Sequence, residues 1–266
     1  MSAILGMPTL IELQSLDETI ELCLKLGLSF IELNMNMPSY CPEELDAGTL
    51  REYTTQTGIN FSLHLPEDID LASFQPTVRA GYMKCCKDAL AWASEAGIKL
   101  VNIHMNSGVH FSLPDQKVYI YDRYFDRFQT AFAESICEIA DIGKRLGIAV
   151  CLENVGNYSL EFVGKTVHDI LNHKNVYLTW DVGHDAEAGF ADRDVILEHS
   201  GSIRHMHLHD WKGAGSHQIL YTGKLDIDGM LDFAGKKNLS VVIEVKTAEA
   251  LAQSIESMRK RHTNKD

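Results

Sequence analysis

The chain has 266 residues, of which 45% are hydrophobic and 23% are charged, and its formal net charge is −13. This composition suits a soluble globular protein that can bury a large core. The acidic balance disfavours a partner that is held by a broad basic surface, such as bulk nucleic acid or an anionic membrane.

The cysteines and the N-terminal residues indicate the compartment. No two of the six cysteines form a CxxC pair, and most lie within apolar periodic segments, as buried free thiols do. They are Cys23, Cys41, Cys85, Cys86, Cys137 and Cys151. The first residues lack the basic and apolar regions of a signal peptide, and no apolar stretch reaches transmembrane length. We therefore expect a cytoplasmic protein.

One unit recurs along the chain: an amphipathic helix, a glycine and a short β-branched or aromatic run. The glycine suits a left-handed residue that ends a helix just before a strand. These glycines are Gly27, Gly58, Gly97 and Gly147. We expect strands at residues 3–8 (or up to 13), 28–33, 59–64, 98–104, 148–153, 176–181, 203–209 and 240–245. We expect helices at residues 16–26, 43–57, 77–96, 125–146, 163–172, 192–199, 228–237 and 248–261.

Local signals mark some of these helix ends. Ser15 and Glu18 form a capping-box pattern at the first helix, and Pro42 favours a start of the second helix at residue 43. The residues after Arg259 have the composition of a frayed tail.

Strict alternation of strands and helices indicates the fold. The strands read as buried apolar runs, as parallel strands covered on both faces do. Eight such βα units predict a (β/α)8 barrel, the TIM barrel, as one domain over residues 1–266. The alternative is a doubly wound open sheet, which would favour a GxGxxG turn after an early strand, and the sequence has none.

Residues able to bind a metal follow most of the predicted strands. They are His64, His104, Glu153, Asp181, His184, His207, His217 and Glu244. Barrel enzymes carry their chemistry at the carboxyl ends of the strands, so these side chains are expected to share one mouth. Three carboxylates would not gather in a partly dry cavity without a cation. Imidazole with carboxylate suits Zn²⁺, Mn²⁺, Fe²⁺ or Co²⁺, and also Mg²⁺.

The last four predicted strands end in Glu153, Asp181, His207 and Glu244. These strands are neighbours around a barrel, so their last inward side chains can converge on one ion. On the seventh strand His205, His207 and His209 share one face because side chains alternate with period two. Alternate residues stand almost 7 Å apart along a strand, so His207 is the expected ligand, with His205 deeper and His209 nearer the rim.

Two loops carry weaker signals. The segment at residues 107–125, rich in aromatic side chains, is expected to form a lid over the mouth or a subunit contact. Lys212 and Lys246 are the cationic candidates for binding substrate, and residues 213–216 could wrap a phosphate.

Four segments resemble the xylose isomerase-like TIM-barrel superfamily, which includes sugar and sugar-phosphate isomerases and epimerases, inosose dehydratase-like proteins and the endonuclease IV family. They are Leu152-Glu153-Asn154, Trp180-Asp181-Val182-Gly183-His184, His207-Leu208-His209-Asp210 and Ile243-Glu244-Val245. The isomerase and epimerase branch implies one divalent metal on Glu153, Asp181, His207 and Glu244. It also implies that Glu153 and Glu244 act as acid and base on opposite faces of the substrate, and that His184 helps to hold substrate oxygens.

The endonuclease IV branch implies three zinc ions on nine ligands. Eight of these positions match His64, His104, Glu153, Asp181, His184, His207, His217 and Glu244. The ninth, an aspartate, falls on Gly215, and the acidic pair Glu67 and Asp68 replaces an aromatic residue that penetrates DNA. Those carboxylates would repel a phosphate backbone.

The sequence therefore predicts a divalent-metal-dependent isomerase or epimerase of a small sugar, sugar phosphate or polyol ketone, which acts through a metal-stabilised enediolate. The alternative is a multinuclear zinc phosphodiesterase like endonuclease IV, which acts on abasic DNA or a smaller phosphate ester. A dehydratase and a sugar-binding barrel without activity also stay open. We expect a small carbohydrate as the partner and no membrane. Nucleic acid belongs to the alternative, and a homo-oligomer stays open.

Overall fold

The computed structural model describes residues 3–213 and 215–263, and within this part of the chain eight parallel strands close into a barrel. In order around the barrel they are β1 (Ile4–Pro8), β2 (Phe30–Asn34), β3 (Asn60–His64), β4 (Leu100–His104), β7 (Ala149–Glu153), β8 (Val176–Asp181), β9 (Ile203–Leu208) and β10 (Ser240–Ile243). Pairing of β10 with β1 closes the sheet, which confirms the predicted (β/α)8 barrel.

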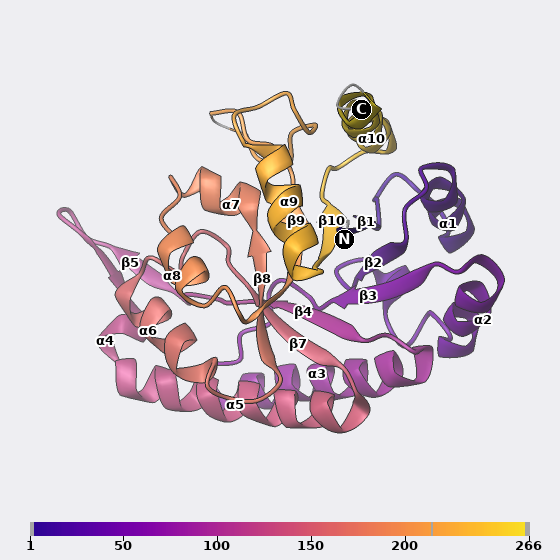
Figure 1. The fold of residues 1–266 in the computed structure, drawn as a ribbon. Helices are drawn as coiled ribbons and strands as arrows, with labels where there is room; N and C mark the ends of the chain where they lie inside the picture. The colour runs from indigo at the N-terminus through magenta and orange to yellow at the C-terminus, as the bar shows by residue number, and fades with distance from the viewer. Residues whose placement is uncertain (1–2, 214, 264–266) are drawn as a thin grey trace.

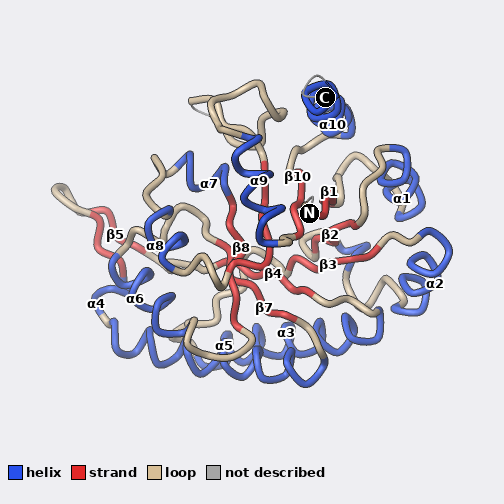
Figure 2. Tube along the Cα trace, viewed as in Figure 1, coloured by secondary structure: helices blue, strands red, loops and turns tan. Residues whose placement is uncertain are grey.

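Helices surround the barrel, as Figures 1 and 2 show. The larger ones are α1 (Leu16–Lys25), α2 (Ala47–Thr57), α3 (Pro76–Ala96), α5 (Phe125–Leu146), α6 (Glu161–Ile170), α9 (Ile227–Lys237) and α10 (Ala248–Thr263). Shorter ones are α4 (Ile120–Arg123), α7 (Val182–Glu187), α8 (Arg193–Glu198) and a 3-10 helix, η1 (Pro38–Tyr40). Among the described residues, no helix combines the length and the hydropathy that a membrane span needs.

The predicted glycine ends are confirmed. Gly58, Gly97 and Gly147 cap α2, α3 and α5 in the left-handed conformation, with φ of 77°, 83° and 70°. Gly27 follows α1 with φ of 65°. A side chain with a Cβ would be strained at these angles, so glycine lets each helix stop and turn directly into the next strand.

Several predicted boundaries are wrong by a few residues. The second helix begins at Ala47 and not at residue 43, because Asp46 caps it by accepting a hydrogen bond from the Thr49 amide (2.9 Å). At the C-terminus α10 continues to Thr263, so residues 260–263 are helical and not frayed, while residues 264–266 lie outside the described range. Strands β9 and β10 end at Leu208 and Ile243, which leaves His209 and Glu244 in the first position after each strand.

The segment expected to form a lid folds as a separate hairpin. Strands β5 (His110–Ser112) and β6 (Lys117–Tyr119) pair antiparallel and project from the side of the barrel (Figure 1). Phe111 on this hairpin is 58% exposed. The hairpin is anchored at its base, where Tyr121 is buried and its hydroxyl hydrogen-bonds to Asp70.

Candidate metal and active site

The four predicted ligands converge at the carboxyl end of the barrel. Glu153 and Asp181 are the last residues of β7 and β8, His207 is the penultimate residue of β9, and Glu244 follows β10. One possible ligand atom from each lies within 4.8 Å of those of the other three. Parallel strands that are neighbours in the sheet present their carboxyl ends at the same rim, which explains why residues far apart in sequence meet here.

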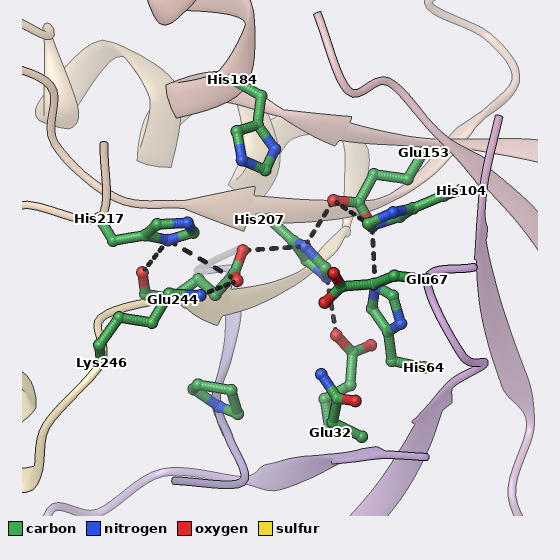
Figure 3. Close-up of a pocket in the computed structure, with 12 residues that line it drawn as sticks. Glu32, His64, Glu67, His104, Glu153, His184, His207, His217, Glu244 and Lys246 are labelled. Atoms are coloured by element: carbon green, nitrogen blue, oxygen red, sulfur yellow. Dashed lines mark hydrogen bonds and ion pairs between the residues drawn. The ribbon is translucent and has the colours of Figure 1, made fainter. Parts of the chain in front are cut away.

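The centre of this group is Nδ1 of His207, which Figure 3 shows between Glu153 and Glu244. It lies 3.1 Å from Glu244 Oε2, 3.2 Å from Glu153 Oε1 and 3.9 Å from Asp181 Oδ2. His207, Glu153 and Asp181 are each at most 1% exposed. Three carboxylates around one imidazole nitrogen leave a concentrated negative charge in a nearly dry site, which must be balanced by a proton or a metal ion.

Several polar atoms of the group fit a metal. His207 Nδ1, Asp181 Oδ2 and His184 Nδ1 are buried, make no well-formed hydrogen bond, and each faces an ionisable side chain of the site. Buried polar atoms almost always form hydrogen bonds, so a cluster of buried ligand atoms without them suits a site that binds a cation. One histidine with carboxylates suits Zn²⁺, Mn²⁺, Fe²⁺ or Co²⁺, and also Mg²⁺.

Glu153 also contacts a second pair of histidines. Its Oε2 lies 3.3 Å from His64 Nε2, and its Oε1 lies 3.6 Å from His104 Nε2. His64 Nδ1 lies 2.7 Å from the carbonyl oxygen of Leu65, which can only accept, so Nδ1 carries a proton and Nε2 is the nitrogen that faces Glu153. Asn102 donates a hydrogen bond to Glu153 from the other side. The structure thus brings the predicted His64 and His104 to the same centre.

The charges of the site follow from this packing. Burial raises the pKa of Glu153 and of Glu244, but the His207 imidazole outweighs it and holds both pKa values well below 4.5. Burial lowers the pKa of His207, but Glu153 and Glu32 outweigh it and raise that pKa well above 6.5. The carboxylates are therefore ionised at neutral pH, and the position of Nδ1 is one where positive charge is strongly stabilised.

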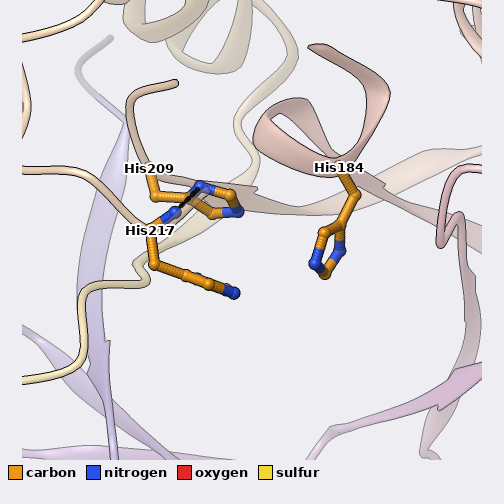
Figure 4. Close-up of side chains that lie close together, drawn as sticks. All are labelled: His184, His209 and His217. Carbon is orange, nitrogen blue, oxygen red and sulfur yellow. Dashed lines mark hydrogen bonds between the residues drawn. The ribbon is translucent and has the colours of Figure 1, made fainter. Parts of the chain in front are cut away.

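A third group consists of His184, His209 and His217 (Figure 4). His209 Nδ1 accepts a hydrogen bond from the His217 amide (2.7 Å), and its Nε2 lies 3.2 Å from Asp181 Oδ1. Both nitrogens of His209 are therefore engaged within the protein. His217, with a left-handed φ of 56°, has its Nδ1 3.1 Å from the Glu244 carbonyl oxygen, which leaves Nε2 free to bind.

The sequence reasoning missed Glu32, which lies within β2 and not at its end. Its carboxylate is 2.7 Å from Nε2 of His207 and 3.0 Å from Nε2 of His205. A glutamate in an otherwise apolar strand was a signal that could have found it, because a carboxylate is rarely buried without a partner.

A cavity of about 140 Å³ opens beside the group. The predicted His64, His104, His184 and His217 line it, and so does Lys246, whose Nζ lies 3.0 Å from Glu244 Oε1. Glu67 lies at its rim (Figure 3). Among the described residues, Lys212 and the hairpin β5–β6 do not line this cavity.

The comparisons with known proteins identify the family of the chain. The family model described as xylose isomerase-like TIM barrel matches residues 20–261, and the chain belongs to that family. An uncharacterised protein of Methanocaldococcus jannaschii, MJ1311, is 25% identical over 239 residues, which cover 82% of this chain and 77% of that protein.

Solved structures share the fold over almost the whole chain. A D-tagatose 3-epimerase-like protein is 22% identical with a TM-score of 0.78, over 99% of this chain and 97% of the other. The IolI protein with a bound zinc atom is 19% identical with a TM-score of 0.75, over 98% and 97%. L-ribulose 3-epimerase is 18% identical with a TM-score of 0.72, over 97% and 93%.

Proposed function

We propose that this member of the xylose isomerase-like TIM-barrel family is a divalent-metal-dependent isomerase or epimerase of a small sugar or polyol ketone. The observation that carries the proposal is the enclosure of His207 Nδ1 by Glu153, Asp181 and Glu244. The names of two structural neighbours, both 3-epimerases or 3-epimerase-like, and the zinc bound to a third support it.

The proposed reaction moves a proton on the carbon next to a carbonyl. A divalent metal held by Glu153, Asp181, His207 and Glu244 would stabilise the negative charge of the enediolate. Glu153 and Glu244 lie on two sides of His207 Nδ1, so one can take the proton and the other can return it. His184 and His217 line the cavity and can hold substrate hydroxyls.

The charges of the cavity favour an uncharged substrate. Lys246 is its one lysine or arginine among the described residues, and Glu244 already pairs with it at 3.0 Å. Glu67 at the rim adds a negative charge that would repel a phosphate. Residues 213–216, the predicted phosphate loop, include Ala214, which lies outside the described residues. We propose an unphosphorylated ketose or inosose, and a protein that acts as one domain in the cytoplasm.

A second candidate is a multinuclear zinc phosphodiesterase like endonuclease IV. One observation favours it: Glu153 belongs both to the group with His64 and His104 and to the group around His207, so two ions could share this carboxylate. Two or three ions serve in-line phosphoryl displacement, whereas one serves an enediolate. The acidic rim and the glycine at position 215 count against this candidate.

The test is metal stoichiometry on untagged protein by elemental analysis, with His64→Ala and Glu244→Gln alongside. The isomerase proposal expects about one ion per chain, which is retained in His64→Ala and lost in Glu244→Gln. Ketoses and inososes in deuterated water should then gain deuterium next to the carbonyl. Two or three ions, some of them lost in His64→Ala, together with cleavage of abasic DNA, would favour the phosphodiesterase.

A further inference from the structure

Glu32 is the centre of a buried polar chain for which the proposed reaction has no use. The residue is 2% exposed. Its Oε1 lies 2.7 Å from His207 Nε2, and its Oε2 lies 3.0 Å from His205 Nε2 and accepts a hydrogen bond from Ser62 Oγ (3.1 Å). The other nitrogen of His205, Nδ1, lies 2.6 Å from Ser240 Oγ. The chain thus runs from Ser240 through His205 and Glu32 to His207.

These contacts determine which ring nitrogens carry protons. A carboxylate can only accept, so Nε2 of both imidazoles must be protonated. The Ser240 hydroxyl can then donate to Nδ1 of His205, so both ring nitrogens of His205 have partners. His207 has no such donor at Nδ1, where it faces the carboxylates of Glu153 and Glu244. Its Nδ1 is therefore the nitrogen available to a cation.

We propose that Glu32 is a positioning residue for the metal: it holds His207 in the tautomer whose Nδ1 lone pair points to the centre. The inference rests on the proposed metal site. A carboxylate on the far nitrogen of a ligating histidine fixes its orientation and makes it a stronger ligand. Glu32 acts through His207, and Ser62 and His205 hold Glu32 in place.

A glutamate at position 32 suits the two imidazoles better than a glutamine would. A carboxylate offers two accepting oxygens, one for each imidazole, whereas a glutamine offers one accepting oxygen and one donating nitrogen. In Glu32→Gln one imidazole must face the donating nitrogen and give up its Nε2 proton. If that imidazole is His207, the proton moves to Nδ1 and blocks the ligand atom.

The test is the Zn²⁺ affinity of the untagged full chain, measured by competition with a chromophoric chelator. Glu32→Gln should weaken zinc binding by about 10–100-fold. The matched control is Glu21→Gln, the same exchange at an exposed residue of the outer helix α1, whose zinc affinity should equal that of wild type. Wild-type affinity in a folded Glu32→Gln protein would overturn the inference.

A second measurement does not depend on a variant. Nitrogen NMR of zinc-loaded protein with ¹⁵N-labelled histidine should show the metal on Nδ1 of His207 and the proton on Nε2. Zinc on Nε2 would overturn the role of Glu32 and leave the metal site intact. Failure of the wild-type protein to bind zinc at all would reject the metal site itself, and the inference with it.

Discussion

At the scale of single residues, Glu153 and Glu244 are two carboxylates in unequal settings. The side chain of Glu153 is 1% exposed and is held by histidines and by Asn102, whereas that of Glu244 is 17% exposed and faces the cavity beside Lys246. Glu153 is thus fixed in place, and Glu244 is the more accessible to substrate. Both remain ionised near neutral pH, because the neighbouring His207 outweighs burial and keeps their pKa values low.

The first prediction concerns this pair. Glu153→Gln and Glu244→Gln should each lower turnover by about 10²–10⁴-fold, because an amide cannot accept the substrate proton. The rate of deuterium exchange into a ketose or inosose substrate measures this, at a metal concentration that elemental analysis shows to be saturating. Asp17→Asn, a carboxylate change on the outer helix α1, is the control and should leave the rate unchanged. A loaded variant that keeps more than about a tenth of the activity would exclude that residue from proton transfer.

The site was predictable from sequence where a ligand follows an apolar run. Glu153 and Asp181 end their strands, so position alone selected them. Glu32 lies in the middle of β2, and although a glutamate in a largely apolar strand indicates a buried partner, nothing local identifies the two imidazoles that it contacts. Its role depends on β9, which is far away in sequence, and only the closed barrel brings the two strands' side chains together.

At the scale of elements, Asp210 organises the loop that carries His217. This buried carboxylate accepts backbone hydrogen bonds from Trp211 (2.8 Å), Gly223 (2.7 Å) and Leu225 (3.1 Å). It thereby joins both ends of a long connection between β9 and α9, which places His217 beside the cavity.

Asp210→Asn should destabilise the protein by about 1–3 kcal/mol, because the amide nitrogen leaves at least one buried amide without an acceptor. Urea unfolding measures the change, and limited proteolysis should show faster cleavage within residues 211–225. The control is Thr222→Ala in the same loop, whose hydroxyl donates to the nearby Ile219 carbonyl oxygen. An Asn variant as stable and as protease-resistant as wild type would contradict this role.

In the hairpin β5–β6, we expect a change at the exposed strand to have little effect on stability and a change at the buried base to have a large one. Phe111→Ser should change the unfolding free energy by less than about 0.5 kcal/mol, because the side chain is exposed and lines no part of the cavity among the described residues. Tyr121→Ser at the buried base should cost roughly 3–5 kcal/mol. Urea unfolding of both variants checks the contrast. A raised KM in Phe111→Ser would support the expectation that the hairpin acts as a lid over the cavity. A changed sedimentation coefficient would support a subunit contact at the hairpin.

The elements themselves were largely predictable. Glycines with positive φ and apolar runs located every barrel strand, since both are local features. The start of α2 was misplaced because Pro42 and the acidic pair after it resemble a helix start, while Asp46 provides the actual cap. Strands β5 and β6 have three residues each, too few for any periodicity to be recognised.

At the scale of the whole molecule, the described part of the barrel gathers four acidic side chains and seven histidines into ligand groups around one site, in a protein whose net charge is −13. Without a metal, protons must balance those carboxylates. Burial lowers the pKa of His64, but Glu153 outweighs it and raises that pKa to about 9, and Asp181 does the same for His184. The protonation of these histidines therefore makes the stability of the whole fold depend on pH.

This coupling predicts different pH dependences for the stability of the metal-free protein and of the zinc-bound protein. A histidine whose pKa rises on folding stabilises the fold fully below its unfolded value near 6.5, and loses that effect as pH rises through about 9. Each such shift corresponds to roughly 3 kcal/mol at most. Protein treated with a chelator should therefore become less stable between pH 6.5 and 9.

Zinc competes with protons for the same nitrogens, so its affinity rises with pH. Zinc-saturated protein should accordingly gain stability relative to the metal-free form across the same interval, by an amount that grows with the free metal concentration. Urea unfolding at several pH values, with and without zinc, measures both trends. The same series in His64→Ala is the control, because that variant should lose part of the decline in the metal-free form. A metal-free protein whose stability stays flat from pH 6.5 to 9 would show that the carboxylates do not hold these imidazoles charged.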